Sequence, residues 1–512
     1  MKSKTLRRLI KLGSLMLVVV IVFMANSVAF AAVNKPFPQA GKWTAYGVTP
    51  KVAYWNGSSW ESQDIPQADQ NQAVISYFES WDSHFYKTYS SQGHSDVGYI
   101  EGHVTGTVPE WGTRDPEPVV SASEHTGYGM IIYALMDGYL KDGVNDVDCK
   151  ARFDSLVRLY NLMKIDGNLM CWAIPETYWT TFSAQQKWIQ GWDDNGDPIE
   201  VYDYPALSSS ATDGDMDIAY ALLLADKQWG GNSPISGKTY KQLALDMINN
   251  GIYNKLINGT TNRILLGDWH SDCISWGDPL FTSYLTRSSD FMIDNLRAFK
   301  ATASTAKQAR FNNAINECYN IMEDFYLNHN SNTGLLSDFI TKVGSDNSAP
   351  APQSVYDDMD EPFPSGAYSE NSCRLPFRLA QDYIHNGGGT TGKTTGKYLN
   401  ALNAFITPKI AGSYKPVWDN SRDGYWINGS LMDWSTPGGS ERLGTHTSYD
   451  ALQFTSCFVS AGIVGSALNL GEGFAYIDNM HAYYQGTGDP YFKDTLTLLN
   501  MLLISRNWWK PY

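Results

Sequence analysis

The chain has 512 residues, of which 13% are aromatic and only 18% are charged, and its formal net charge is −15. This charge excludes nucleic acid as a partner, because phosphate binding needs clusters of Lys and Arg that the sequence lacks. The 17 Trp and 31 Tyr residues exceed what a core of this size needs. Rings of this kind are suited to stacking on flat apolar ligand faces, of which sugar rings are one example.

The first 31 residues predict a secretory signal peptide. Five Lys and Arg residues lie within the first 11 positions, the apolar run "LMLVVVIVFMA" follows, and Ala29-Phe30-Ala31 supplies a small-x-small cleavage site. The apolar run is shorter than the roughly 20 residues that a membrane-spanning helix needs. We therefore expect residues 1–31 to be removed and residues 32–512 to be secreted, with no membrane attachment after cleavage.

Helical periodicity dominates the rest of the chain. Apolar residues recur with a spacing near 3.6 in six segments: 123–140, 215–229, 238–256, 288–303, 309–327 and 494–509. Long loops rich in Gly, Pro, Asp and Trp separate them, and loops of this length in a compact domain are usually functional or disordered. No change in composition divides the chain. We predict one all-helical domain over residues 32–512, with helices paired as hairpins around a centre and the loops gathered into a cleft.

No metal or cofactor is expected. The six cysteines lie far apart without a CxxC pair, which indicates neither a zinc site nor a dense disulfide framework and leaves one or two disulfides open. Residues 193–200 and 419–426 resemble calcium loops. The first lacks the Gly at loop position six, and the second has Ser430 in place of the bidentate Glu.

Two acidic segments lie where polar loops enter helices. In the segment 211–217, Asp213, Asp215 and Asp217 precede the apolar face of a helix that is expected to start near Asp215. A structural interpretation is available, in which Thr212 caps the helix and acidic side chains favour its N-terminus. Three neighbouring Asp residues nevertheless repel one another, so capping alone does not explain the segment.

Glu124 has the same placement, at the start of the helix that follows Ser123. The structural interpretation is a first-turn partner of the helix dipole. The functional interpretation is a general acid, a carboxyl group kept protonated near neutral pH by burial and by a neighbouring carboxylate. Asp213 could supply that neighbouring charge.

The two segments carry a resemblance to a known family. "SEHTGYGM" at 123–130, followed by "ATDGDMDIAYALLLADKQW" at 211–229, resembles the signature segments of glycoside hydrolase family 8. Weaker matches cover nearly the whole mature chain, at 265–269, 288–299, 332–339, 371–378 and 507–512. The resemblance implies an (α/α)6 barrel, which is six helical hairpins in a toroid. It also implies an inverting endo-glycanase that hydrolyses internal β-1,4 bonds without a cofactor.

By this resemblance Glu124 is the general acid and Asp213 is the central carboxylate. In the cellulase and xylanase branches the general base is an Asp at the position of Asn371 in this chain. An amide cannot take a proton from water. The departure matches the chitosanase and mixed-linkage glucanase branch, in which the Asn orients water and a Glu on a preceding loop is the base. That role falls on Glu361, although a solvated acidic loop is its structural alternative, and Glu370 is the second candidate.

A loop can deliver such a base from a distance. An inverting enzyme separates its two carboxyl groups by roughly 6.5 to 9.5 Å so that a water fits between them. Five residues are expected to bind the substrate, with core packing as the alternative for the aromatic ones: Trp172, Trp269, Tyr128, Arg374 and Phe492. For Trp508 and Trp509 we expect core packing.

The substrate is the least determined feature. Asn371 favours chitosan or β-1,3-1,4-glucan, and an acidic cleft would suit the cationic chitosan, whereas Glu370 keeps a cellulase-type β-1,4-glucanase as an alternative. A non-catalytic glycan-binding protein on the same fold is a second hypothesis. A polysaccharide lyase is a third, although the acidic chain argues against a polyanionic substrate. We expect a monomer whose partner is the polysaccharide.

Overall fold

The computed structural model describes the placement of residues 33–42, 51–55, 60–102, 119–141, 143–144, 146–176, 188–192, 198–201, 209–343, 347–352, 365–389, 391–410, 424–430, 451–464 and 490–512. The chain divides into two compact units, Met1–Asn34 and Lys35–Tyr512, and every element below belongs to the second. The predicted signal peptide and Glu361 lie outside the described residues. Within the part that is described, no helix is long and apolar enough to cross a membrane.

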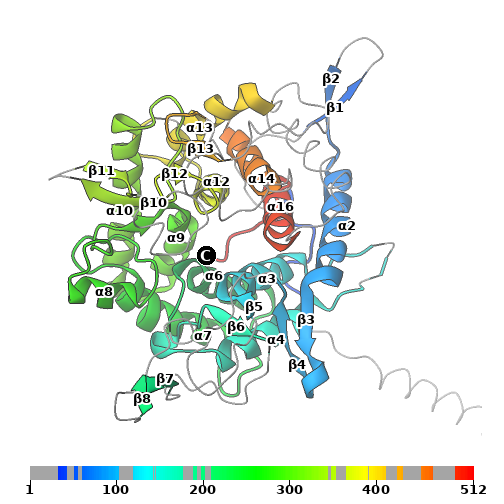
Figure 1. Ribbon diagram of the computed structural model, residues 1–512. Helices are drawn as coiled ribbons and strands as arrows, with labels where there is room; N and C mark the ends of the chain where they lie inside the picture. Colours follow the sequence, from blue (N-terminus) through cyan, green and yellow to red (C-terminus); the bar gives the residue numbers. More distant parts are fainter. Residues whose placement is uncertain are drawn as a thin grey trace, which may run out of the picture. The chain divides into compact units, whose positions relative to one another are not determined.

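An inner ring of six helices is the centre of the described part of the second unit (Figure 1). Each helix packs against the next in chain order, and the last returns to the first. The ring consists of α3 (Ser123–Met136), α6 (Thr212–Gln228), α9 (Ile293–Thr302), α12 (Leu375–Asn386), α14 (Ala451–Ala461) and α16 (Pro490–Ile504).

Outer helices pack against this ring. α4 contacts α3, α7 contacts α6, α10 contacts α9, α13 contacts α12, and α2 contacts α16. Their bounds are Gln67–Phe85 (α2), Cys149–Leu162 (α4), Tyr240–Met247 (α7), Thr305–Asn328 (α10) and Thr395–Ile410 (α13). α7 continues as π-helix over Ile248–Leu256 (η3), and the short α8 spans His270–Trp276. The pairing of inner and outer helices confirms the predicted all-α class and the (α/α)6 barrel.

Burial separates the two rings as the sequence pattern requires. In α3 every residue except Glu124 is buried, and α6 is buried without interruption from Thr212 to Ala225. A helix that is buried on all sides belongs to the interior of a large fold. The outer helix α4 instead buries a single stripe that includes Phe153, Leu156 and Tyr160. The hydrophobic core therefore lies between and within the two rings.

Short antiparallel sheets occupy parts of the segments that were expected to be loops. β5 leads directly into α3, and β12 precedes the turn that carries Asn371, so strands fix the chain where inner helices begin. The paired strands are β1 (Lys51–Trp55) with β2 (Trp60–Asp64), β3 (Tyr86–Tyr89) with β4 (His94–Ile100), β5 (Val119–Ala122) with β6 (Ala173–Pro175), β7 (Trp188–Trp192) with β8 (Pro198–Val201), β10 (Phe339–Val343) with both β9 (Thr286–Arg287) and β11 (Asn347–Pro350), and β12 (Ala367–Tyr368) with β13 (Tyr425–Trp426).

The C-terminal segment after α16 packs onto the inner helices, and Figure 1 marks the chain end inside the ring. Trp508 and Trp509 are buried, which confirms the core packing expected for them. The Tyr512 hydroxyl donates to Asp294 Oδ1 at 2.6 Å, and His385 Nε2 lies 2.9 Å from the carbonyl oxygen of Trp508. The described residues form no disulfide.

Candidate active site

Glu124 is the second residue of α3 and the one member of that helix whose side chain reaches solvent. Strand β5 feeds the chain into the helix, and the Ser123 backbone N–H donates to the carbonyl oxygen of Trp172 at 2.9 Å. These contacts fix the start of α3. The Glu124 side chain keeps 17% of its surface exposed, whereas its neighbours in the helix are buried. A carboxyl group is therefore held at the N-terminus of a helix that is otherwise buried.

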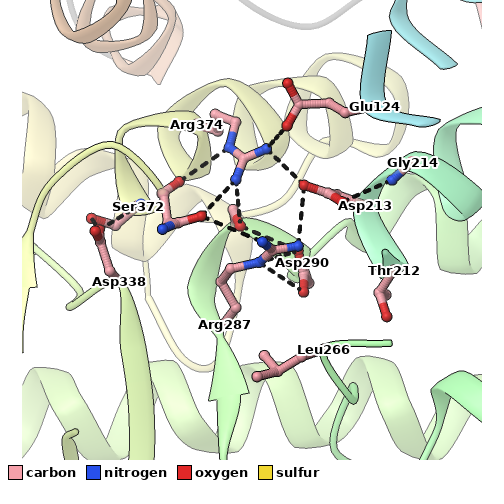
Figure 2. A network of polar contacts seen from close by, with 12 residues as sticks. Glu124, Thr212, Asp213, Gly214, Leu266, Arg287, Asp290, Asp338, Ser372 and Arg374 are labelled. Atoms are coloured by element: carbon pink, nitrogen blue, oxygen red, sulfur yellow. Dashed lines mark hydrogen bonds and ion pairs between the residues drawn. The ribbon is translucent and has the colours of Figure 1, made fainter. Parts of the chain in front are cut away.

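Asp213 occupies the same position, second in its helix, at the start of α6. The helix begins at Thr212, three residues earlier than expected. The expected capping role of Thr212 is wrong, because its hydroxyl donates to the Leu265 carbonyl oxygen at 2.6 Å and ties α6 to the preceding segment. Asp215 does not serve the helix start either, since its Oδ1 accepts the Met170 N–H at 2.8 Å. Asp213 Oδ1 accepts from the Gly214 N–H at 2.9 Å (Figure 2).

Two glycines let the starts of α3 and α6 meet. A Cβ atom at Gly214 would lie 2.7 Å from the Glu124 backbone nitrogen, and one at Gly127 would lie 2.7 Å from Asp217 Cβ. Real side chains do not tolerate such approaches, so only glycine fits at both positions. The glycines in the two acidic segments thus bring Glu124 and Asp213 to one place.

Arg374 joins these carboxyl groups. It lies in the 3-10 turn η5 (Ser372–Arg374) at the start of α12 and is almost fully buried. Its Nη1 donates to Glu124 Oε2 and, at 2.8 Å, to Asp213 Oδ2. Figure 2 shows the guanidinium between the two acids. Arg287, Asp290 and Asn371 are connected to these three residues by the contacts described below. We name the six residues Glu124, Asp213, Arg287, Asp290, Asn371 and Arg374 the Arg374 network.

Arg287 and Asp290 are members that the sequence analysis missed. Arg287 Nη2 lies 3.1 Å from Asp213 Oδ2, and its Nε lies 3.2 Å from both carboxylate oxygens of Asp290. Asp290 is fully buried. Both residues lie in the turn from β9 to η4 (Ser288–Asp290). Helical spacing predicted a helix from residue 288, but α9 begins only at Ile293, so this turn was not predicted. The one available signal was an Arg and an Asp at the edge of the segment 288–299.

The electrostatics of the network separate its two principal acids. Burial raises the pKa of Glu124 to about 7, and the charge of Asp213 adds to this rise while Arg374 opposes it. Burial also disfavours the charge on Asp213, but Arg287 and Arg374 outweigh it and hold the pKa of Asp213 well below its usual range. Near neutral pH the site therefore offers a protonated carboxyl beside a carboxylate. Such a pair can donate a proton and stabilise a developing positive charge.

Asn371 lies in the network as an acceptor. Its Oδ1 receives Arg374 Nη2 at 2.9 Å and Arg287 Nη1 at 3.5 Å. Asp338 Oδ1 holds the surrounding turn, since it accepts the backbone N–H groups of Ser369 at 2.9 Å and Ser372 at 2.8 Å. The neighbouring Glu370 is half-buried, and its carbonyl oxygen accepts from the Cys373 thiol at 3.0 Å.

The predicted substrate-binding side chains differ in exposure. Trp172 and Trp269 are half-buried, and Trp269 packs against Phe281 with ring centroids 5.4 Å apart. Phe492 is also half-buried, with the Arg374 guanidinium carbon 5.8 Å from its ring centre. Tyr128 is fully buried, and its hydroxyl accepts from Arg378 Nη2 at 3.4 Å. Substrate contact by these residues stays a prediction.

The described residues contain no group of three or more His, Cys, Asp or Glu side chains that could hold a metal ion. Of the two segments that resemble calcium loops, 193–197 and 419–423 lie outside the described residues.

A helical toroid whose inner helices present a protonated carboxyl beside a carboxylate has the parts of an enzyme that cleaves glycosidic bonds. The family model for "Glycosyl hydrolases family 8" matches residues 184–361. A beta-glucanase of Niallia circulans is 30% identical over 484 residues, which is 94% of this chain and 93% of that protein. The chain belongs to glycosyl hydrolase family 8 and is a glycoside hydrolase.

Two further relatives cover most of the chain. An endoglucanase of Bacillus sp. strain KSM-330 is 30% identical over 487 residues, which is 94% of this chain and 83% of that protein. The apo structure of a beta-1,3-1,4-glucanase from Paenibacillus sp. X4 superimposes with a TM-score of 0.65 at 30% identity. That similarity covers 94% of this chain and 100% of the other.

Proposed function

We propose that this protein is a secreted, inverting endo-β-glucanase that hydrolyses internal β-1,4 bonds of a β-glucan. The observation that carries the proposal is that Glu124 and Asp213 both pair with Arg374, yet the pKa of Glu124 is raised and the pKa of Asp213 is lowered. Two carboxyl groups with opposite protonation near neutral pH are what acid-catalysed glycoside cleavage needs.

In the proposed reaction Glu124 gives its proton to the glycosidic oxygen as the bond from that oxygen to the anomeric carbon breaks. Positive charge develops on the sugar ring, and the ionised Asp213 stabilises it. A water attacks the anomeric carbon from the opposite face and loses one proton to a general base. The configuration at that carbon is thereby inverted, and Glu124 ends ionised while the base ends protonated.

Glu361 is the proposed base, with Glu370 as the second candidate. Asn371 cannot serve, because an amide does not take a proton from water. Its Oδ1 already accepts from Arg374 and Arg287, which leaves its amino group as the part that can donate a hydrogen bond toward a water. This polarity supports a role in orienting the nucleophile, with the base supplied by a separate carboxylate.

The names of the relatives support β-glucan as the substrate class. One relative is named a beta-glucanase, another an endoglucanase, and the Paenibacillus structure is of a beta-1,3-1,4-glucanase. We therefore propose mixed-linkage β-glucan first and cellulose-type glucan second. Chitosan, which the acidic chain would also suit, is the third arm of the test.

The test is a panel of lichenan, carboxymethyl-cellulose, chitosan and xylan, with released reducing ends measured and product anomers followed by NMR. We expect lichenan to be cleaved fastest and the first products to be inverted. Glu124→Gln should lower the rate by about 10²- to 10⁴-fold, the range attributed to a general acid, and still bind oligosaccharide. Retained configuration, or full activity of this variant, would refute the mechanism.

Further outcomes separate the remaining hypotheses. Binding to glucans without release of reducing ends would identify a glycan-binding protein, and products that absorb in the ultraviolet would identify a lyase. Glu361→Gln and Glu370→Gln, compared in parallel, assign the base by whichever removes hydrolysis. Secretion is tested by N-terminal sequencing of protein from the culture medium, for which we expect the chain to begin at Ala32.

A further inference from the structure

Asp290 has no part in the reaction described above, yet it lies in the Arg374 network. The side chain is fully buried, and both of its oxygens lie 3.2 Å from Arg287 Nε. The Ser289 hydroxyl donates to Asp290 Oδ1 at 3.2 Å, and Arg374 Nη2 donates to that same hydroxyl oxygen at 3.2 Å. Asp290 therefore contacts one arginine directly and the other through Ser289.

Asp290 influences Asp213 and Asn371 through the contacts of Arg287. With Nε held by Asp290, the other two nitrogens of the planar guanidinium point to fixed places. Nη2 lies 3.1 Å from Asp213 Oδ2, and Nη1 lies 3.5 Å from Asn371 Oδ1. Figure 2 shows Arg287 between Asp213 and Asp290. Loss of the Asp290 anchor would let Arg287 rotate and would release both other contacts.

The charge count of the network gives Asp290 a second effect. Three carboxyl groups, Glu124, Asp213 and Asp290, share two guanidinium groups, Arg287 and Arg374. Two negative charges balance the two arginines, so the third carboxyl favours its neutral form in this buried place. As long as Asp290 and Asp213 are ionised, the retained proton belongs to Glu124, the most exposed of the three carboxyl groups.

We propose that Asp290 is a positioning residue, which orients Asp213 and Asn371 through Arg287 and whose negative charge keeps the proton of the network on Glu124. The proposal rests on the proposed function, because it assigns Glu124 the acid role. Asp290 itself touches neither substrate nor reacting atoms in this scheme.

The titration of the groups agrees with this order of protons. Burial raises the pKa of Asp290 to about 6, with Arg287 opposing the rise, whereas burial raises that of Glu124 to about 7. Between these values the larger part of Asp290 is ionised and the larger part of Glu124 is neutral. The charged groups that face Asp290 are Arg287, Asp213 and Arg374, and the groups that face Glu124 are Arg374, Asp213, Arg287 and Tyr128.

The test compares Asp290→Asn with the wild type on the best substrate of the panel, with kcat and KM measured across pH. Removal of the negative charge leaves Arg287 uncompensated, which favours the ionised form of Glu124. The alkaline limb of kcat should therefore move to lower pH by about one unit, the lower end of the effect of a nearby charge. Misplacement of Asp213 should lower the maximal kcat by about 10- to 100-fold, with a much smaller change in KM.

Two further variants separate the effects. Asp137→Asn removes another buried carboxyl, which accepts from Trp229 Nε1 at 2.6 Å at the far end of α3, and should leave the pH profile unchanged. Arg287→Lys keeps the charge but loses the fork that grips Asp290. It should lower kcat without moving the alkaline limb. An unchanged limb or an unchanged kcat in Asp290→Asn would overturn the proposal, as would an equal shift in Asp137→Asn.

An infrared pH titration of the ligand-free protein gives a readout that needs no turnover. In the wild type, protonated carboxyl bands should titrate at the two raised pKa values, about 6 for Asp290 and about 7 for Glu124. The Glu124 band should vanish in Glu124→Gln and move to lower pH in Asp290→Asn. If the wild type cleaves no glycan but the band behaves in this way, the proposed function fails and the proton assignment stands. If the wild type is active and the band does not move in Asp290→Asn, only the inference about Asp290 fails.

Discussion

Two buried polar networks differ in how completely their carboxylates are satisfied. In the Arg374 network three carboxyl groups share two arginines, and Glu124 remains 17% exposed. In the second, which we name the Asp294 network, Asp294 accepts from five side chains: Tyr220, Gln381, His385, Asn386 and Tyr512. Burial disfavours the Asp294 charge, but His385 and the two tyrosine hydroxyls hold its pKa below the usual range.

Position in the helix does not explain this difference. Glu124, Asp213 and Asp294 are each the second residue of an inner helix, where the dipole favours a negative charge. Asp294 is enclosed by donors and ties the C-terminal segment to the barrel. Glu124 has one arginine, which it shares with Asp213, and a path to solvent. A surplus of carboxyl groups over arginine charges thus distinguishes the site suited to proton transfer from the site suited to stability.

The largest expected effect comes from removal of the shared arginine. Arg374→Met should lower kcat/KM by about 10²- to 10³-fold, the cost of one lost donor in a preorganised site, because Asp213 would lose a partner and its pKa would rise. Rates on lichenan across pH provide the measurement. Arg297→Met removes another arginine, paired with Asp382 at 2.7 Å and partly exposed, and should keep its activity. Equal losses of kcat/KM in the two variants would show that Arg374 contributes no more to activity than an arginine outside the network.

An intermediate effect is expected in the pH dependence of stability. The pKa of Glu124 rises from 4.5 in the reference state to about 7 in the folded protein. The native state therefore binds more protons than the unfolded state within this window, and stability falls as pH rises through it. The loss amounts to about 3 kcal/mol at 1.36 kcal/mol per unit.

Glu124→Gln should lack this decline. The free energy of unfolding, measured in denaturant below pH 4.5 and above pH 7, should fall with rising pH more in the wild type than in the variant. For Asp294→Asn the sign is opposite and the window lies below pH 3.8, because the depressed pKa of Asp294 adds stability that is lost only as pH falls below this value. Parallel curves for wild type and Glu124→Gln would show that Glu124 is not the buried proton holder.

The sequence predicted four of the six members of the Arg374 network, two of its three acids and two of their three partners. Glu124 and Asp213 follow from acidic residues beside glycines at the starts of two strongly apolar helices, and Asn371 and Arg374 follow from the family resemblance. Arg287 lies outside the segments with helical spacing, and Asp290 lies at the start of one of them, 288–303, where the structure has a 3-10 turn in place of a helix. Their role depends on three chain segments that meet only in the folded barrel.

The same limit applies to the fold. The six segments with helical spacing include the inner helices α3, α6, α9 and α16. Of α12, only the first residues belong to a predicted segment, the family match at 371–378. Its buried face contains Arg378, Gln381, Asp382 and His385, which are satisfied by partners from other helices. Helical periodicity is recognised from the spacing of apolar residues, so a helix whose buried face is partly polar gives only a weak signal in the sequence. The short sheets depend on tertiary contacts, and a two-stranded pair has little stability of its own.

The smallest expected effect tests the Asp294 network through its last residue. Tyr512→Phe removes the hydroxyl that donates to Asp294 Oδ1 at 2.6 Å and should lower the free energy of unfolding by about 2 kcal/mol, the value of a hydrogen bond to a charged group. Tyr160→Phe is the matched control, since its hydroxyl donates at 2.7 Å to the neutral carbonyl of Asn168 and should cost about 1 kcal/mol. Both variants should retain the kcat and the alkaline limb of the wild type, because neither hydroxyl belongs to the Arg374 network. A shift of the alkaline limb of kcat in Tyr512→Phe would mean that the two networks are electrostatically coupled. The division between a stabilising and a reactive network would then be wrong.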